Sequence, residues 1–555
     1  MPDLRKEPER STIQGGFRRK WKFLPKVGTG VSFDSPLSSK AFAALNREDE
    51  PARRTKTGWQ FAALGGAAVV FLFFHLFHFP FVPVWRMGDQ SFWLEHADRM
   101  LQGEVLYRDL FQFNLPGTEY LYYALFSWFG PALWVAPLAL LLTGTAATLL
   151  VFSLSRKVLY GTAALLPPVA FLVMGLRNAL DGTHQWYSTL LVLLAVNLIA
   201  ECCNRVRLAA AGALLGLASL FTSSRGVVVV ASVCVFLLWK LRPGRDAAKA
   251  FVALLLPFAV VVGGAMLYLA HMVGTKPLLD SVLVFPLRYY SAGDANNLSS
   301  VLRGEWQSIL PLRWRSLLLI SLWLVVNTGV PLTLIAFFAE PFRRRAADLR
   351  SSTAGQRLVL FAMVGISLVL AVASAPTAPR LNCAAAFAFV VAAAMLREFG
   401  GRRLLRGILA VMVLLGLTEL LAAEIRWNRK VDGPRGAAIF QEPERYAQFV
   451  WVAQHAHSGD GLFGDTDFNF FFGLQNPAPL PWVSPDAYTR PEQVQSVVHA
   501  LNRQHTRFVI WSEELENSRA PGENLQPLRS YLLEHYRLVQ QFDDGTEVLE
   551  STPQS

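Results

Sequence analysis

The amino-acid sequence predicts a mainly α-helical protein with a polytopic membrane domain and a small α/β domain outside the membrane. Hydrophobic residues make up 53% of the 555 residues and charged residues 17%, whereas an average soluble domain carries roughly 25% charge. The mean hydropathy is +0.32. Long apolar runs recur between about Phe61 and Leu421 while both ends of the chain are polar, which is typical of membrane-spanning helices flanked by polar regions.

The first element is a polar arm, placed at residues 1–58 and expected to be disordered and cytosolic. It is too long and too polar to be a cleavable signal peptide. Its basic stretches "RKEPER" and "FRRKWK" have the composition of segments that touch anionic lipid. An ordinary solvated tail is the favoured explanation of the same residues.

The membrane domain, placed at residues 59–424, contains about eleven segments that are apolar enough to cross a bilayer. They begin near Phe61, Ala132, Gly161, Trp186, Leu208, Val227, Phe251, Leu317, Leu358, Cys383 and Leu404. The stretch from Leu208 to Trp239 is interrupted at "TSSRG", and two short spans or a re-entrant hairpin both fit this interruption. Either arrangement leaves the orientation of the later segments unchanged.

Basic loops orient these segments. The even-numbered segments end at "SRK", "CNRVR", "WKLRPGRDAAK", "PFRRRAADLR" and "REFGGRRLLR", and Lys and Arg concentrate in cytoplasmic loops. We therefore expect a cytoplasmic N-terminus and a C-terminus on the opposite side. The same bias explains the formal net charge of +11. Nucleic acid is not an expected partner, because no soluble segment shows a basic stripe with interleaved aromatic residues.

The polar tail, placed at residues 425–555, reads as a small α/β domain outside the membrane. The stretch "PERYAQFVWVAQHA" has the apolar spacing of a helix, and "GLFGD", "RFVIW" and "TEVLE" look like short strands. The stretch "NPAPLPWVSP" is a proline-rich loop. Asp465 and Asp467 follow the first of these strands, where we expect turn chemistry.

The first outer loop, residues 85–117, is unusually polar for a loop that follows a membrane span. After Asp89 the apolar residues recur at helical spacing, at Trp93, Ala97, Met100 and Leu101, and Gly103 supplies a stop. We expect an amphipathic helix from Phe92 to Gln102 that lies on the membrane surface. Its charged residues Glu95, Asp98 and Arg99 are then expected to face water.

Asp89 lies just before the first turn of this helix, and two roles fit it. An acidic residue at a helix start caps backbone N–H groups and suits the helix dipole. A carboxylate at the membrane face is also a good general base for a hydroxyl group, provided that its neighbours tune its pKa and geometry.

Two arginines interrupt apolar surroundings on the same outer face. Arg225 lies in the "TSSRG" break and Arg380 in "APTAPRLN". A charge at membrane depth is costly and is usually functional or paired, and the guanidinium group is well suited to phosphate. Phosphate binding is therefore one expectation for both, with a structural ion pair or interfacial snorkelling as the alternatives.

Other polar residues of the outer loops are candidates for a binding site. Asp181 and His184 share the short loop "LDGTHQWYS", where they could shape a donor site or bind a divalent metal together with Asp89. Two ligands in one loop are a weak metal signal, and capping of the next span by Asp181 is the favoured alternative. Tyr289, with Tyr290 and Asp294, belongs to the long loop "LRYYSAGDANN" and could line an acceptor groove or simply be solvated. The four cysteines lack metal-ligand spacing.

The order of features in the first outer loop, "GDQSFWLEHADRMLQGEVLYRDLFQFNLPGTEYLYYALFSWFG", resembles that of bacterial membrane glycosyltransferases of the GT-C superfamily. These are relatives of the protein O-mannosyltransferases and of the lipid A aminoarabinose transferase. The matching residues are Asp89, the helix from Phe92, Gly103, Tyr107 and Asp109, then Asn114, Pro116 and Gly117. The stretch "AAAGALLGLASLFTSSRGV" also resembles the glycine-rich fifth segment of that superfamily, so the resemblance covers most of the chain from about Trp59.

The resemblance implies an enzyme of GT-C architecture in a bacterial inner membrane, with its C-terminal domain in the periplasm. Such an enzyme moves a sugar from a polyprenyl phosphate to an acceptor hydroxyl on the outer face, with inversion at the anomeric carbon. Asp89 matches the catalytic carboxylate, while Tyr107, Asp109, Asn114, Asp181, His184 and Tyr289 are substrate-site candidates. The partners would be the lipid-linked donor, membrane lipids and a lipid, glycan or protein acceptor. No cofactor is expected to be required, although a divalent metal stays open.

The chain departs from the GT-C pattern at two points. Many relatives carry Asp-Glu where this chain has Asp89-Gln90, and the usual Pro-Pro turn is here Leu115-Pro116-Gly117. A non-catalytic protein of envelope assembly therefore remains an alternative function. A lipid or glycolipid transporter of similar architecture is a second alternative, for which inverted repeats and charges at mid-membrane would be expected.

Overall fold

The computed structural model describes residues 58–86, 88–293, 296–309, 324–339, 349–424, 429–518, 520 and 522–552. The expected polar arm therefore lies outside the described residues except for Gly58. Asp294, the predicted start of a span near Leu317 and most of the loop "PFRRRAADLR" also lie outside them.

Among the described residues, seven helical segments are long and apolar enough to cross a membrane. They are α2 (Gly58–Leu76), α5 (Val135–Arg156), α9 (Ser223–Leu241), α10 (Arg245–Val273), α17 (Thr353–Ala371) and the two halves of α18 (Ala378–Glu424). The halves of α18 meet at Gly401, whose φ of 65° breaks the helix and which only glycine adopts without strain. The chain is an integral membrane protein, and the predicted fold class is confirmed.

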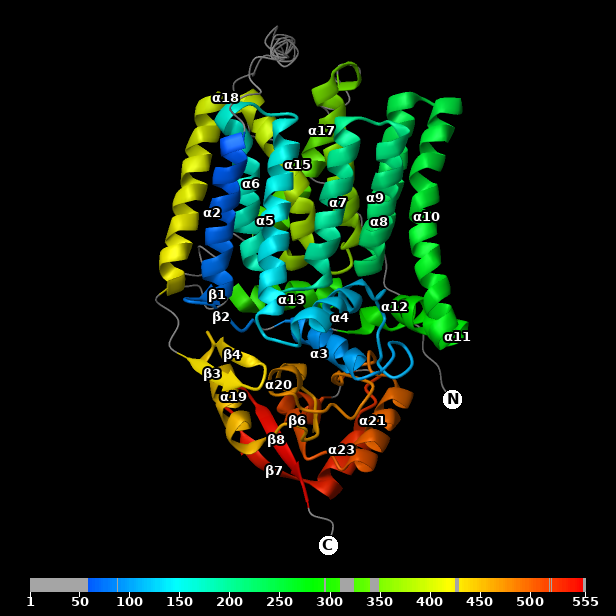
Figure 1. The fold of residues 1–555 in the computed structure, drawn as a ribbon, viewed down its shortest axis with the longest axis vertical. Helices are drawn as coiled ribbons and strands as arrows, with labels where there is room; N and C mark the ends of the chain where they lie inside the picture. The colour runs from blue at the N-terminus through cyan, green and yellow to red at the C-terminus, as the bar shows by residue number, and fades with distance from the viewer. Residues whose placement is uncertain are drawn as a thin grey trace, which may run out of the picture. The chain divides into compact units, whose positions relative to one another are not determined.

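Shorter segments pack beside these helices (Figure 1). They are α6 (Leu166–Ala170) with its flanking turns from Gly161 to Asn178, α7 (His184–Glu201), α8 (Arg205–Phe221) and α15 (Val330–Phe337). α8 and α9 are separate helices that meet at Thr222, whose backbone is extended. The glycines of α8 let α10 approach closely, because a Cβ at Gly212 would overlap the carbonyl oxygen of Leu254.

Short elements connect the membrane helices on the side of the C-terminal domain (Figure 1). They are the hairpin of β1 (Phe77–His78) and β2 (Val82–Pro83), then α3 (Gln90–Leu101), α4 (Gly117–Phe129), α11 (Thr275–Leu279), α12 (Phe285–Arg288) and α13 (Leu298–Ile309). They come from the segment between α2 and α5, which contains the first outer loop, and from the long outer loop, residues 274–315. The two loops thus form a layer between the bundle and the domain.

The C-terminal domain contains a two-stranded and a four-stranded sheet. β3 (Lys430–Gly433) pairs with β4 (Gly436–Ile439), and the larger sheet has the strand order β5-β6-β8-β7. In it, β5 (Leu462–Phe463) is parallel to β6 (Phe508–Ser512), whereas β8 (Thr546–Ser551) is antiparallel to both β6 and β7 (Tyr536–Gln541). The helices are α19 (Pro443–His455), α20 (Thr466–Phe472), α21 (Pro491–Gln504), α22 (Glu513–Asn517) and α23 (Gln526–His535). The expected helix at "PERYAQFVWVAQHA" and the three expected strands are confirmed.

One aromatic core joins this domain to the outer loops. Trp85, which follows β2, packs against Phe440, Phe449 and Phe471 of the domain with ring centroids 5.4 to 6.0 Å apart. Phe126 of α4 stacks on Phe470 at 5.6 Å. The domain is therefore packed onto the first outer loop and is not tethered to the membrane helices by a linker alone.

The expected environment of α3 was wrong. Glu95, Asp98 and Arg99 do not face water, because the C-terminal domain covers them and leaves them 4%, 9% and 8% exposed. Asp98 pairs with Arg435 across a 2.6 Å contact, and Arg99 pairs with Glu95 and Glu104. A helix with one charged face fits a protein partner with complementary groups as well as it fits water, so periodicity alone could not separate the two.

Reporter fusions at Gly355 and Ser555 are expected to report opposite sides of the membrane, with Gly355 in the cytoplasm. Three spans, α17 and the two halves of α18, separate Gly355 from the C-terminal domain, and an odd number of crossings changes sides. Alkaline phosphatase is active only outside the cytoplasm and green fluorescent protein only inside, so the two reporters check each other. Equal behaviour at both positions would contradict this topology.

Candidate functional site

A cavity of about 550 Å³ lies where the outer loops meet the C-terminal domain. Its walls come from the first outer loop, the start of α7, the α8–α9 junction, the long outer loop, the α17–α18 connection and the domain. The Asp, Glu, His and Arg residues that line it are Asp89, His184, Arg225, Arg380, Asp486 and Glu514. The cavity thus collects ionisable groups from segments almost 430 residues apart in sequence, from Asp89 to Glu514.

Asp89 faces this cavity and does not cap α3. It occupies the residue before the helix with helical backbone angles, φ −68° and ψ −7°, and its side chain accepts no capping hydrogen bond. The carboxylate is exposed to the space of the cavity yet surrounded by protein on the other sides. Burial therefore raises the pKa of Asp89, and the positive charge of Arg380 partly opposes this rise. The capping role considered from sequence is not observed.

Asp181 lies behind Asp89, against the preceding glycine. A Cβ built on Gly88, whose φ is +143°, would come within 2.9 Å of the Asp181 carboxylate, so glycine is needed here for space and for backbone conformation. Asp181 does not cap α7, because Thr183 occupies that position without a side-chain capping bond. Burial and the negative charge of Asp89 raise the pKa of Asp181 to about 7.

Arg225, in the first turn of α9, lines the cavity and is only 2% exposed. Its guanidinium donates to the carbonyl oxygen of Gln185 at 2.6 Å, to Ser188 Oγ at 3.0 Å and to Thr189 Oγ1 at 3.3 Å. These acceptors in the described residues are all neutral, and Nε has no partner among them. The start of α7 therefore holds the group in place, and no carboxylate in the described part of the chain forms an ion pair with it.

Arg380 lies beside Arg225, although 155 residues separate them in the sequence. One Nη of Arg225 donates to the carbonyl oxygen of Arg380 at 3.5 Å. The Arg380 side chain donates to Asn296 Oδ1 at 2.8 Å and to the Tyr290 hydroxyl at 3.3 Å. Two cations with neutral partners therefore line the same cavity as the carboxylate of Asp89, which is an arrangement suited to an anionic group.

The other predicted site residues divide into two groups. His184 and Asn114 line the cavity. Tyr107 is buried with a φ of 67°, and its hydroxyl donates to the carbonyl oxygen of Asn114, while Asp109 accepts from the backbone N–H of Val105 and pairs with Arg108. These last two residues shape the first outer loop and do not reach the cavity.

In the long outer loop the cavity is lined by Tyr290 and not by Tyr289. Tyr289 packs on Phe285, and the Arg490 guanidinium lies 5.7 Å from its ring centroid. Tyr290, which the sequence analysis named only as a neighbour of Tyr289 in the same loop, contacts Arg380. The backbone conformation of a short irregular loop decides which of two adjacent tyrosines faces the site. The sequence of such a loop has no periodic pattern from which that conformation could be predicted.

Several lining residues were not anticipated. They are Asn296, Ser223 and Ser224 from the membrane domain, and Trp482, Asp486, Tyr488 and Glu514 from the C-terminal domain. Trp482 and Tyr488 belong to the proline-rich loop, defined here as residues 476–488. The aromatic residues in "PLPWVSPDAY" were the available signal, but a proline-rich stretch with aromatic residues is equally typical of a surface loop.

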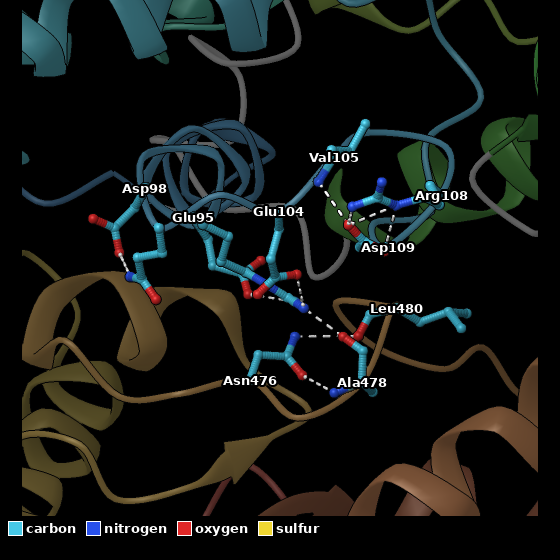
Figure 2. A network of polar contacts seen from close by, with 11 residues as sticks. Glu95, Asp98, Glu104, Val105, Arg108, Asp109, Asn476, Ala478 and Leu480 are labelled. Atoms are coloured by element: carbon cyan, nitrogen blue, oxygen red, sulfur yellow. Dashed lines mark hydrogen bonds and ion pairs between the residues drawn. The ribbon is translucent and has the colours of Figure 1, made fainter. Parts of the chain in front are cut away.

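The proline-rich loop is fastened to the first outer loop (Figure 2). Arg99 donates to the carbonyl oxygen of Ala478 at 2.9 Å. The Phe111 N–H donates to the carbonyl oxygen of Pro479 at 2.9 Å. The Asn476 side chain accepts from the Ala478 N–H and donates to the carbonyl oxygen of Leu480. The loop that carries Trp482 into the cavity is therefore held in place in two ways. Hydrogen bonds from the first outer loop reach its backbone, and the Asn476 side chain fixes the start of the loop.

A second buried network holds another part of the cavity wall in place. The Gln112 side-chain oxygen accepts from the backbone N–H groups of Phe113 and Asn114, and its amide donates to Glu119. Gln112 and Glu119 are fully buried, and Phe113 and Asn114 line the cavity. Burial raises the pKa of Glu119 to about 8, so this carboxyl group is largely protonated at neutral pH.

The described residues contain no group of three or more His, Cys, Asp or Glu side chains that could hold a metal ion. Asp89, Asp181 and His184 do not form such a group in this arrangement. The four cysteines, Cys202, Cys203, Cys234 and Cys383, are free.

Comparisons with known proteins reveal a shared fold. No protein-family model matches the chain, and no curated protein matches it in sequence. Among solved structures, ArnT from Cupriavidus metallidurans bound to undecaprenyl phosphate is similar with a TM-score of 0.54 and 14% identity, over 90% of this chain and 100% of that one. An oligosaccharyltransferase from Archaeoglobus fulgidus matches over 90% of this chain and 75% of the oligosaccharyltransferase chain, with 13% identity and a TM-score of 0.46. The similarity to ArnT shows that this chain has the GT-C fold.

The Glu119→Gln variant is expected to flatten the pH dependence of stability between about pH 4.5 and 8. The folded protein keeps the Glu119 proton up to about pH 8, whereas the unfolded chain releases it near pH 4.5. The contribution of this group to stability is therefore full below that range and is lost as the pH rises through it. Thermal unfolding of the detergent-solubilised protein at several pH values measures the effect. Glu492→Gln, which changes an exposed carboxylate of α21, is the control, and a difference between wild type and Glu119→Gln that does not vary with pH would contradict the assignment.

Proposed function

We propose that this protein is a membrane glycosyltransferase. It would move a sugar from a polyprenyl-phosphate donor to an acceptor hydroxyl at the outer face of a bacterial inner membrane, with inversion. The observation that carries the proposal is the presence of Asp89, Arg225 and Arg380 in one cavity. A carboxylate that can accept a proton thus faces two cations suited to the phosphate that must leave.

The donor is proposed from both the site and the fold. Arg225 and Arg380 lie in the first turns of the membrane helices α9 and α18, so an anionic group bound by them would lie near the bilayer surface. ArnT, which has the same fold, was solved with undecaprenyl phosphate. A sugar carried on a lipid phosphate would place its anomeric carbon on the aqueous side of that phosphate, toward Asp89.

Each step of the transfer is assigned to a residue of the chain. Asp89 takes the proton of the acceptor hydroxyl as its oxygen attacks the anomeric carbon. The bond between that carbon and the phosphate oxygen breaks, and the phosphate leaves with the electron pair. Because this leaving group is an anion, it needs positive charge more than it needs a proton, and Arg225 and Arg380 supply that charge before and after the bond breaks.

The environment of Asp89 suits a general base. Burial raises its pKa, which makes the carboxylate a stronger proton acceptor, while the positive charge of Arg380 opposes part of this rise and so favours the ionised form that a base requires. Asp181 behind Asp89 adds a second carboxyl group with a pKa of about 7. A proton accepted by Asp89 would therefore relieve the repulsion between these two groups.

Asp89→Asn is expected to lower turnover by at least about 10²-fold, the lower end of what a general base contributes. Because the Asp89 side chain makes no capping bond, the amide should leave the unfolding temperature nearly unchanged. Transfer of radiolabelled sugar from a polyprenyl-phosphate donor by the purified protein in lipid nanodiscs measures the rate. Asp432→Asn, which changes a carboxylate with 75% side-chain exposure on β3, is the control. Near-normal transfer by Asp89→Asn, or loss explained by unfolding, would remove Asp89 from the mechanism. Absence of transfer by the wild-type protein with every donor would favour the non-catalytic alternative.

Arg225→Gln and Arg380→Gln are each expected to weaken binding of undecaprenyl phosphate by about tenfold or more, the size of a lost charge-assisted hydrogen bond. Arg225→Lys should retain part of the affinity, because it keeps the charge but loses the fork geometry. Microscale thermophoresis with the lipid phosphate in detergent micelles is the measurement. The matched control is Arg242→Gln, an exposed cation at the opposite end of α9. Unchanged affinity in both cavity variants would show that these arginines do not bind the phosphate and have only a structural role.

A further inference from the structure

Resting on the proposed function, we infer that the acceptor is a neutral carbohydrate and that it binds the half of the cavity formed by the C-terminal domain. Its ring would stack on Trp482, with Tyr488 and Phe113 completing an aromatic wall. The cavity would then have two halves. The half with the two arginines would bind the donor phosphate, and the half with the aromatic rings and the carboxylates of the C-terminal domain would bind the acceptor.

Trp482 is close to the proposed base. Its ring packs edge-on against Phe92, with centroids 5.5 Å apart, and Phe92 lies one turn after Asp89 on the same face of α3. The indole nevertheless remains 38% exposed and lines the cavity. A large apolar ring that is open to the cavity and contacts a residue one helical turn after the base is placed to hold the molecule whose hydroxyl the base deprotonates.

Other aromatic rings of the cavity lining pack together near Arg380. Phe113 packs against both Tyr488, with ring centroids 6.3 Å apart, and Tyr290, at 5.4 Å. Tyr290 in turn accepts from Arg380. A sugar ring presents C–H groups on its faces and hydroxyls at its edge, and so matches aromatic faces interspersed with a few polar groups. Asn114, Asn296 and Ser484 supply such groups in the cavity lining.

The charges of the lining argue against an anionic acceptor. Both arginines lie on the membrane-domain side, whereas the Asp and Glu residues that the C-terminal domain contributes to the lining are Asp486 and Glu514. A phosphorylated acceptor held there would face these two carboxylates, and like charges at short range disfavour such a partner. The hydroxyls of a neutral sugar can instead donate to them.

The lining also argues against recognition of a peptide by strand pairing. None of the described residues that line the cavity belongs to a β-strand, so no sheet edge is open there for an extended peptide. The domain offers side chains on a fastened loop, since Arg99 and Phe111 hold residues 478 and 479 in place. A surface fixed before binding loses little conformational entropy when the acceptor arrives.

Binding measured without turnover tests this inference. The full-length protein in nanodiscs is examined by saturation-transfer difference NMR with three kinds of probe. The neutral probes are maltotetraose, cellotetraose and a mannose tetramer, the anionic probe is a glucosamine disaccharide bisphosphate, and the third is a threonine-containing hexapeptide. We expect at least one neutral tetramer to bind more tightly than the bisphosphate and the peptide.

Substitutions locate the binding surface. Trp482→Ala is expected to weaken binding of the neutral tetramer by about tenfold, and Trp482→Phe by less, because a smaller ring still offers a face. Trp128→Ala changes a tryptophan that is 80% exposed at the end of α4 but does not line the cavity, and should leave binding unchanged. The phenylalanine variant decides the matter if the alanine variant does not fold.

Binding of undecaprenyl phosphate in the same samples separates this inference from the proposed function. Tighter binding of the bisphosphate or the peptide, no binding of any neutral tetramer, or an equal loss in Trp128→Ala would each overturn the inference, even if donor binding and glycosyl transfer are intact. Normal tetramer binding with no donor binding and no transfer would instead overturn the proposed function and leave a carbohydrate-binding membrane protein.

Discussion

The site depends on the packing of the C-terminal domain against α3. Arg435 of the β3–β4 hairpin pairs with Asp98, and Arg99 bonds to the proline-rich loop. Both contacts are largely buried. Removal of one partner of the Asp98–Arg435 ion pair would leave an uncompensated charge and cost about 3–5 kcal/mol. Asp89 lies at one end of this helix and Trp482 at the end of the fastened loop, so the contact that joins the domains also sets the distance across the cavity.

The charged residues in and around this cavity are of two kinds. Arg225 is satisfied by a carbonyl oxygen and two hydroxyls, which fix its position without neutralising it. Asp89 is similarly free of capping bonds. Groups that are held by neutral neighbours keep their charge available for a ligand, whereas Arg99 and Arg435 are already paired with carboxylates. The two kinds of charged residue therefore serve different purposes.

Much of the membrane architecture could be read from the sequence, because a bilayer accepts only segments that satisfy their own backbone hydrogen bonds. Apolar length therefore located the helices, and charge or polarity at their ends singled out Asp89, Arg225, Arg380 and His184. Asn114 was named only through the resemblance to the GT-C superfamily. The environment of α3 was misjudged because a polar helix face suits a protein partner as well as water. Trp482, Tyr488 and Asn296 were missed for another reason: their place in the cavity depends on docking between distant segments. β7 was missed because "YRLVQQ" is too polar to show a clear strand pattern.

The shared core has an evolutionary consequence. One continuous cluster of buried residues includes Trp93 and Tyr122 from the first outer loop and α4, and Phe449 and Phe470 from the C-terminal domain. A recombination event at the apparent domain boundary near residue 425 would therefore divide this core and combine two surfaces that had not been selected together. The first outer loop and the domain must diversify as one unit of inheritance, so a change of acceptor through exchange of the domain would have to bring its own version of α3 and α4.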